Sequence, residues 1–444
     1  MKKLAYFIVF IIAVTIVFYG ADPVLSRTIY FKEVLDNRLT VLIKSNPDSK
    51  VFAVNILAKG RSALEPEGKT GISEFVNRMM LKGTKDYDAE ELSRALDYNG
   101  VQLTLHDNPY IPYDDRYTSQ AFAFVKLETI DEFAEPALGL LAQIVGYPTF
   151  PEDRIEEVRG EIQGVLGMNM GSTYKNAASL FRKELFPESP YSKDVMGNMR
   201  TISSITQSDL VTHHAILYSP ENIIMAVATN IPPEICIQMI ETELGGLTNV
   251  GYDYPAPQYV EPISDRARTH KYMDKDQVYI YYGNIVPGMD NPSYPALKIA
   301  TSALSTRLKL KLREEQGLAY SVGSGISLYP ELGVFVASMG TGYRNFNQAF
   351  SGIRNEIRKL QSDGITEQER TNTTNSLWGS MLSRNLARIN QAYYMALHEY
   401  LGVGFQYWDS YIEKLRAVTT QEVQAAAVKY FPYDSYVLAT VGKK

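Results

Sequence analysis

The chain has 444 residues, of which 45% are apolar and 21% are charged, and its formal net charge is −6. This length is too great for one ordinary domain, so two or three domains with sizeable cores are expected. The acidic balance argues against a nucleic-acid-binding protein and provides no basic face for an anionic membrane surface.

The N-terminus has the layout of an export signal. Met1-Lys2-Lys3 is basic, and an apolar run follows from Leu4 to Ala21. A short basic segment before an apolar stretch is typical of a secretory leader, here of bacterial style. The run is also near the length of a short membrane-spanning helix, so an uncleaved anchor is the alternative to cleavage. We therefore expect residues 1–27 to be a signal peptide or N-terminal anchor of a protein exported to the bacterial periplasm.

The segment 71–84 is the most informative part of the chain. Its apolar residues recur at helical spacing and predict one buried stripe, formed by Ile72, Phe75, Val76 and Met79. Glu74, Asn77 and Arg78 lie at i, i+3 and i+4 on the neighbouring stripe, and Lys82-Gly83-Thr84 follows. This segment resembles the zinc-site helix of the insulinase-like, or pitrilysin-type, metallopeptidases, in which His-x-x-Glu-His shortly precedes Lys-Gly-Thr. In that motif one helix face offers two imidazoles to the metal, and the glutamate activates its water.

The resemblance implies that Glu74 and Arg78 occupy the two histidine positions and that Asn77 replaces the catalytic glutamate. It also implies that Glu161, in the sequence Val-Arg-Gly-Glu-Ile, matches the third metal ligand. One of four zinc-site positions is therefore retained, and a guanidinium has no lone pair for a metal. We expect a degenerate site with no zinc in this chain.

Glu74 and Arg78 also form an i,i+4 pair in the favourable order, with the glutamate first. In a family-like fold Glu161 would approach the same place, and Arg78 between two carboxylates would supply the positive charge that zinc supplies in active relatives. The alternative is that Arg78 points into solvent, where an exposed ion pair contributes little to stability.

The chain repeats itself after about 211 residues. Residues 123–129 resemble 334–341, and residues 205–210 resemble 418–423. Each copy then reaches Tyr-x-Pro and a closing apolar strand. A period of this length indicates a duplicated domain rather than a solenoid.

Strand-like runs at 39–43 and 51–57, with a counterpart at 277–282, precede the helical segments of each copy. This order predicts an α+β fold with helices packed on one face of each sheet. The resemblance implies two homologous α/β sandwich domains, of the mitochondrial-processing-peptidase type, in a clam-shell arrangement.

The Pro-rich segment 246–268 is the expected linker between the copies. We place the N-terminal peptidase-like domain at 28–245 and the C-terminal one at 269–444.

The only cysteine, Cys236, lies in an apolar run and is expected to be a buried structural thiol. His213 and His214 are adjacent and point to different helix faces, and His398 has no partner histidine at i+4. The other two histidines are isolated. We interpret all five as structural or surface residues rather than as metal ligands.

A second match lies in the C-terminal copy. Arg313 and Tyr320 are seven residues apart, within Leu-Arg-Glu-Glu-Gln-Gly-Leu-Ala-Tyr. Insulinase-like enzymes carry an Arg and a Tyr with this spacing, which face the zinc across a chamber and hold the substrate backbone. The guanidinium offers several donors to carbonyl oxygens, and the hydroxyl can donate to a developing oxyanion. The alternative is a surface salt bridge for Arg313 and a core position for Tyr320.

A chain without zinc ligands but with the Arg/Tyr pair resembles the non-catalytic subunit of two-chain family members. The resemblance implies a substrate-positioning partner of a related, zinc-bearing subunit that cleaves peptides or unfolded proteins. The cofactor would then be zinc in the partner and none in this chain. Two alternatives remain: a scaffold or peptide-binding protein with no proteolytic role, and an active metalloenzyme that uses Glu161 with other ligands.

Overall fold

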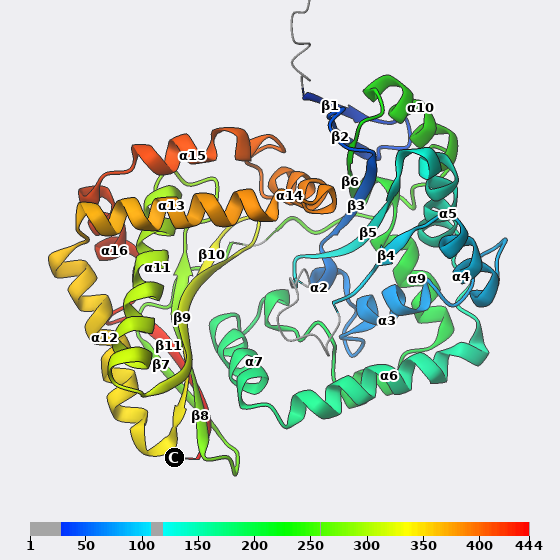
Figure 1. Ribbon diagram of the computed structural model, residues 1–444. Helices are drawn as coiled ribbons and strands as arrows, with labels where there is room; N and C mark the ends of the chain where they lie inside the picture. The colour runs from blue at the N-terminus through cyan, green and yellow to red at the C-terminus, as the bar shows by residue number, and fades with distance from the viewer. Residues whose placement is uncertain (1–27, 108–118, 258, 444) are drawn as a thin grey trace, which may run out of the picture.

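The computed structural model describes residues 28–107, 119–257 and 259–443, so the predicted leader at 1–27 lies outside the described residues. Within these ranges the chain forms two lobes, each built on its own sheet (Figure 1). No helix of the described part combines the length and the apolar character needed to cross a membrane.

The N-terminal half contains a mixed sheet with the strand order β1-β2-β6-β3-β5-β4. Strands β2 and β6 are parallel, and the other neighbouring strands are antiparallel. The central strands are covered on both faces and therefore read as nearly continuous apolar runs. The strands are β1 (Ile29–Val34), β2 (Thr40–Ser45), β3 (Val51–Lys59), β4 (Gln102–Thr104), β5 (Phe122–Ile130) and β6 (Ile223–Thr229).

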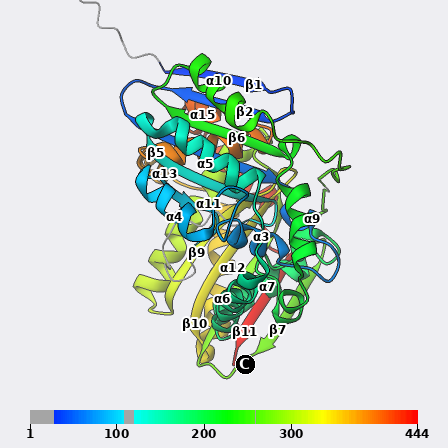
Figure 2. The same ribbon diagram turned by 90° about the vertical axis from the view of Figure 1, so that its right-hand side faces the viewer.

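The helices of this half lie mainly on the outer face of the sheet, where Figure 2 shows α4 and α5 in front of the strands. Helix α10 packs on α5 and β2, and α3 packs on α6 and α9. The helices are α2 (Arg61–Leu64), α3 (Ile72–Met79), α4 (Ala89–Tyr98), α5 (Ala134–Gly146), α6 (Glu152–Met170), α7 (Thr173–Leu185), α8 (Met199–Ser203), α9 (Gln207–Leu217) and α10 (Pro233–Leu244).

The C-terminal half repeats this design with the strand order β7-β11-β8-β10-β9. The strands are β7 (Arg266–Tyr272), β8 (Gln277–Val286), β9 (Ala319–Leu328), β10 (Gly333–Gly342) and β11 (Tyr436–Gly442). The helices are α11 (Tyr294–Leu308), α12 (Phe346–Asp363), α13 (Glu367–Arg384), α14 (Arg388–Tyr400), α15 (Tyr407–Ala417) and α16 (Thr420–Tyr430), and a π-helix, η4 (Lys309–Glu315), extends α11.

The two sheets have matching topologies. The order β2-β6-β3-β5-β4 corresponds strand by strand to β7-β11-β8-β10-β9, and the parallel pair β2/β6 corresponds to β7/β11. The repeated segments 123–129 and 334–341 lie in the equivalent strands β5 and β10, and the two closing strands are β6 and β11. The predicted duplicated α+β fold is confirmed, with β1 as an additional edge strand of the first sheet.

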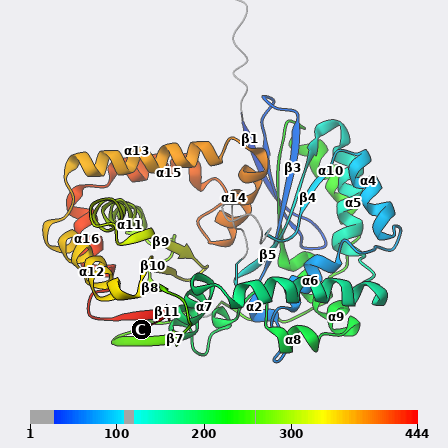
Figure 3. The same cartoon turned by 60° about the horizontal axis from the view of Figure 1, so that its bottom comes forward.

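Each half also contributes one helix to the other half (Figure 3). Helix α7 packs on β8 and β11 of the second sheet, and α14 packs on β3 and β6 of the first. The sequence predicted helices on one face of each sheet, but a helix from the opposite half covers the other face. One apolar cluster consequently includes residues of both halves, among them Leu57, Phe181, Ile285, Tyr393 and Val437.

The proposed linker at 246–268 contains no helix or strand in residues 246–257 and 259–265, but its end is wrong, because β7 already begins at Arg266. Asn284 holds this segment against the second sheet: its side chain accepts a hydrogen bond from the Ile263 amide and donates one to the Ile263 carbonyl. Polar contacts join the halves directly as well, because the Tyr400 hydroxyl donates to the Ala121 carbonyl at 2.9 Å.

Candidate functional site

Helix α3 carries three of the predicted site residues. It begins after Gly71, whose φ of 93° lies in the left-handed region. A Cβ at this position would meet the backbone nitrogen of Gly197 at 2.7 Å, so only glycine fits. All eight residues of α3 are buried, including the stripe of Glu74, Asn77 and Arg78 that the sequence placed beside the apolar one.

Glu74 lies between two guanidinium groups. Arg61 donates from Nη2 to Glu74 Oε2 at 2.8 Å, and Arg78 donates from Nε to Glu74 Oε1 at 2.9 Å. Burial alone would raise the pKa of Glu74, but Arg61 and Arg78 outweigh burial and hold this pKa below its usual value. Glu74 is therefore an ionised carboxylate, and both of its oxygens are engaged.

Arg78 reaches a second carboxylate on α6. Its Nη1 lies 3.8 Å from Glu161 Oε2, while its own side chain is only 7% exposed. The alternative in which Arg78 points into solvent is therefore wrong. Glu161 is 45% exposed and also lies 3.7 Å from Lys82 Nζ, which in turn binds Glu157 at 2.8 Å. Arg78 thus lies between the two carboxylates at zinc-site positions, with the stronger contact to Glu74.

Asn77 has a structural role in this arrangement. Its Nδ2 donates to the Leu105 carbonyl at 2.7 Å, and its Oδ1 accepts from the Tyr218 hydroxyl at 2.8 Å. An amide does not titrate and cannot replace a carboxylate as a general base. Asn77 therefore ties α3 to the end of β4 and to the end of α9.

The residues at the zinc-site positions do not fit a zinc ion. Both Glu74 oxygens bind guanidinium groups, and Arg78 repels a cation from the space that a metal would need. Among the described residues, no group of three or more His, Cys, Asp or Glu side chains is arranged to hold a metal.

The nearby histidines belong to the core. His213 Nε2 lies 2.9 Å from Ser73 Oγ, and His214 Nε2 lies 2.9 Å from the Val145 carbonyl. Burial lowers the pKa of His213 to about 3 and that of His214 to about 4. Cys236 is also fully buried, and burial raises the pKa of its thiol to about 12. These side chains are therefore buried within the N-terminal half.

Arg313 and Tyr320 lie on the other half. Arg313 is on the π-helix η4, a helix type frequently found at functional sites, and Tyr320 is on β9, the edge strand of the second sheet. The side chain of Arg313 is 52% exposed, with its Nε 3.4 Å from the Glu314 carboxylate, and Tyr320 is 88% exposed. The alternative of a core position for Tyr320 is therefore wrong, whereas Arg313 does form the surface ion pair that the alternative predicted.

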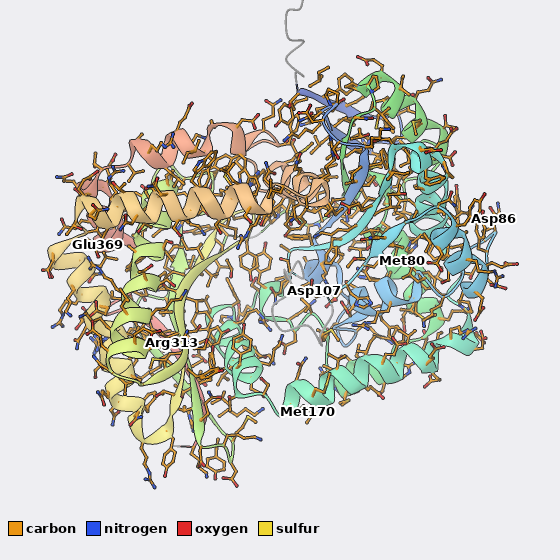
Figure 4. All side chains as sticks on the ribbon, viewed as in Figure 1. Met80, Asp86, Asp107, Met170, Arg313 and Glu369 are labelled. Atoms are coloured by element: carbon orange, nitrogen blue, oxygen red, sulfur yellow. The ribbon has the colours of Figure 1, made fainter. Side chains whose placement is uncertain are left out.

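Figure 4 shows Arg313 on the C-terminal lobe, and Met80 and Asp107, which flank the α3 site, on the N-terminal lobe. Among the described residues no hydrogen bond or ion pair joins Arg313 or Tyr320 to α3. The structure therefore brings Glu74, Arg78 and Glu161 together and leaves the Arg/Tyr pair on a separate, exposed surface.

Two models of one sequence family match the chain. The insulinase (peptidase family M16) model matches residues 40–180, and the M16 inactive-domain model matches residues 204–377. The chain belongs to the M16 family. The first match includes α3 and Glu161, and the second includes η4 and β9, so all the predicted site residues lie within M16 domains.

M16 relatives span nearly the whole chain. An uncharacterized zinc protease of Bacillus subtilis, YmxG, is 24% identical over 91% of this chain and 96% of its own length. A Helicobacter pylori relative described as a non-peptidase homolog, also called YmxG, is 20% identical over 93% of this chain and 94% of its own.

Solved structures of M16 proteins share the fold. The crystal structure of a peptidase M16 inactive domain from Pseudomonas fluorescens has a TM-score of 0.84 and 19% identity, covering 94% of this chain and 98% of that one. The periplasmic protease PqqL of Escherichia coli has a TM-score of 0.77 and 15% identity, covering 96% of this chain and 47% of PqqL. These comparisons show the M16 fold over nearly the whole chain, and among the relatives named here the description as a non-peptidase homolog belongs to the Helicobacter pylori protein.

Sequence reasoning missed two contributors to this M16 site. Arg61 is the first residue of the short helix α2, and no spacing in the sequence connects it with Glu74. Tyr218 lies 141 residues from Asn77. Its Tyr-x-Pro motif indicated the duplication of the domain but gave no sign of a contact with Asn77. Arg61 could have been suspected only from the need of a buried Glu74 for positive charge.

Proposed function

We propose that this chain is the non-catalytic, substrate-positioning subunit of a heterodimeric zinc metalloendopeptidase that acts on peptides or unfolded proteins. One observation supports the proposal: in this M16 fold Arg78, at a position that the family resemblance assigns to a metal-binding histidine, is paired with carboxylates, while Arg313 on η4 and Tyr320 on the edge strand β9 are exposed. The zinc of the complex would belong to a related subunit with an intact His-x-x-Glu-His helix.

In this proposal Arg313 and Tyr320 bind the substrate backbone beside the partner's zinc. A large aromatic side chain that is 88% exposed gains no stability from packing, so its place on β9 favours a contact with another molecule. Arg313 would donate to peptide carbonyl oxygens, and the Tyr320 hydroxyl would donate to the oxyanion as the peptide bond is attacked. Neither contact depends on the substrate side chains.

We also propose that the protein works in the periplasm. The basic and apolar start of the sequence supports export, and PqqL, which shares the fold, is described as periplasmic. The segment 1–27 would then be either a cleaved signal or the only membrane contact.

The proposal is tested by mixing this chain with an M16 chain of the same organism that carries the zinc motif, and by following cleavage of casein. The mixture is expected to be active and this chain alone inactive. Arg313→Ala and Tyr320→Phe are each expected to lower kcat by about 100-fold, which is typical of losing one oxyanion donor. The melting temperature should not change, because both side chains are exposed.

Arg344→Ala and Tyr343→Phe are the matched controls. These residues form an exposed Arg/Tyr contact on the same half, with Arg344 Nε 3.0 Å from the Tyr343 hydroxyl, and their loss should leave cleavage unchanged. Full activity of the Arg313 and Tyr320 variants would mean that the pair does not bind substrate. No cleavage with any zinc-bearing partner would favour the alternative of a scaffold or peptide-binding protein.

A further inference from the structure

The two halves differ at one edge of their sheets. Strand β1 covers the outer edge of β2 and pairs with it antiparallel along its whole length. Strand β7, the equivalent of β2, pairs only with β11 among the described residues, and Figure 3 shows it at the outer edge of the second sheet. Four of the six β2 residues are buried, whereas none of the seven β7 residues is. The second sheet therefore has a place for one more strand that its described residues do not fill.

The backbone of β7 is available for pairing at this edge. The Tyr436 amide donates to the Asp265 carbonyl, so every second residue from Asp265 onward faces β11. The residues between them, such as Arg266 and Arg268, turn their backbone groups toward the open edge. The Arg266 amide donates to the Asp265 carboxylate at 2.6 Å, whereas no described group bonds the backbone of Arg268. An open edge of this kind can take an extended strand from another chain.

Arginine side chains gather beside this edge, on the face of the second sheet that packs against α12. The guanidinium carbon of Arg268 lies 5.8 Å from the ring centres of both Phe350 and Tyr436. Arg354 on α12 contacts the same two rings, at 5.9 and 5.8 Å. Arg358, one turn later on α12, lies over a tyrosine ring that Arg354 also contacts. Aromatic side chains therefore hold three guanidinium groups close together.

None of these three arginines forms an ion pair with a described carboxylate. Arg268 donates to the Tyr436 hydroxyl at 2.6 Å, Arg354 donates to the Tyr433 carbonyl at 3.1 Å, and Arg358 donates to the Tyr433 hydroxyl. The Nε of Arg354 is buried and has no hydrogen-bond partner among the described residues. Stacking on aromatic rings holds a guanidinium in place but leaves its charge uncompensated. The surface beside β7 is therefore prepared for carboxylates.

The charge of the edge decides which strand fits there. Strand β7 carries Arg266, Arg268 and Lys271 and no acidic residue, and of these three only Arg266 forms an ion pair in the described part of the chain, with Asp434. Two copies of β7 side by side would place like charges opposite each other, which is destabilising, so a second copy of this chain does not fit. A lone charge on an edge strand serves to prevent pairing. Arginines that converge from both β7 and α12 instead favour an acidic strand.

We propose that the open edge of β7 binds an extended, acidic segment of a partner protein. The segment adds antiparallel to β7, as β1 adds to β2, and its acidic side chains face Arg268, Arg354 and Arg358. Residues directly opposite in an antiparallel pair share a face of the sheet. The residue opposite Arg268 therefore directs its backbone groups toward β7 and its side chain toward the arginines. This binding is a property of the chain alone and does not require a zinc-bearing subunit.

The test uses the purified full chain and two fluorescein-labelled 10-residue peptides, one of alternating threonine and glutamate and one of alternating threonine and lysine. Fluorescence anisotropy is expected to show that the glutamate peptide binds at least about 10-fold more tightly, the combined effect of two or three exposed ion pairs. N-methylation of its two central glutamates removes amide donors that face β7 and should lower the affinity by at least about 10-fold. N-methylation of its two central threonines, whose amides face solvent, should leave the affinity nearly unchanged.

Arg268→Glu/Arg358→Glu changes two exposed arginines of the edge and is expected to lower the affinity for the glutamate peptide by at least about 10-fold. The same variant should bind the lysine peptide more tightly than the unmodified chain does. Arg384→Glu/Arg416→Glu is the matched control, because it makes the same charge change at exposed arginines of the same half, on α13 and α15. The control should bind like the unmodified chain.

Three outcomes would overturn the proposal: equal affinity for the two peptides, equal loss in the control variant, or equal effects of the two N-methylations. The last outcome would show that charge alone attracts the peptide, without strand pairing. The peptide comparisons use the unmodified chain, so they decide the matter even if the Arg268 and Arg358 variant does not fold.

Discussion

Arg61, Glu74 and Arg78 form a buried cluster of two positive charges and one negative charge. All three side chains are at most 7% exposed, so none of them can regain its hydration without opening the core. Ions with so little solvent contact are stable only when each has a partner. Arg78 gains a second partner in Glu161, which is half-exposed and contributes less.

Arg78→Ala is expected to lower the free energy of unfolding by about 3–5 kcal/mol, the usual cost of breaking a buried ion pair by removing one partner. The urea midpoint measures this change. Lys82→Ala is the matched control, since its carboxylate partners Glu157 and Glu161 are each 45% exposed, and it should cost less than about 1 kcal/mol. An unchanged midpoint for Arg78→Ala would show that Arg61 alone neutralises Glu74.

Helical spacing was sufficient to predict how these residues meet on α3, because positions i and i+4 share a face whatever surrounds the helix. The approach of Glu161 required the family resemblance, since spacing alone does not pack α6 against α3. The position of Arg61 could not be predicted. Arg61 is 13 residues before Glu74, and the two side chains meet because the chain turns before α3 begins after Gly71. This contact depends on the tertiary fold, which spacing along the sequence does not give.

At the scale of elements, the exchange of α7 and α14 explains how each sheet is covered on both faces. Ala392, Tyr393 and Ala396 on one face of α14 are buried against the first sheet. The helix is anchored at its first residue by Arg388, whose Nη1 donates to the Thr229 carbonyl at 2.8 Å and whose Nη2 donates to the Ser49 carbonyl at 3.2 Å. An amphipathic pattern predicts that a helix packs on a sheet, but not which sheet, so the sequence did not reveal this exchange.

Arg388→Met is expected to destabilise the protein by about 2–4 kcal/mol, because the buried Thr229 carbonyl and the partly buried Ser49 carbonyl lose hydrogen bonds to a charged donor. Because methionine keeps an unbranched apolar side chain, the lost stability measures the hydrogen bonds of the guanidinium group. The urea midpoint measures this loss of stability. Faster hydrogen exchange in α14, β3 and β6 would show that the loss arises where α14 packs on the first sheet. Arg384→Met, one helix earlier, should have a much smaller effect. Equal losses for the two variants would contradict an anchoring role for Arg388.

At the scale of the molecule, the two halves form one body. The apolar cluster between them, the exchanged helices and the contacts of Arg388 and Tyr400 make each half incomplete without the other. The sequence predicted the duplication correctly because equivalent strands of the two halves have similar residues. It also placed the Arg/Tyr pair on one half and the degenerate helix on the other.

Three buried histidines make the stability of the protein depend on pH. Burial lowers the pKa of His213 to about 3, that of His214 to about 4 and that of His398 to about 3. In the unfolded chain these histidines have an ordinary pKa of about 6.5. Near pH 5 the unfolded chain therefore binds about three more protons at these sites than the folded chain does, and the difference is smaller toward pH 6.5 and toward pH 4. Stability is fully present above pH 6.5 and falls as the pH decreases.

Each of these protons contributes a slope of about 1.4 kcal/mol per pH unit, so the three histidines together give about 4 kcal/mol per unit near pH 5. Urea midpoints measured between pH 7 and pH 5 should decrease accordingly. His398→Phe should reduce the slope by about one third, because a phenyl ring can occupy the aromatic cluster of Tyr394, Tyr407 and Trp408 without titrating. If the slope of this variant equals that of the unmodified chain, His398 is not held neutral in the core.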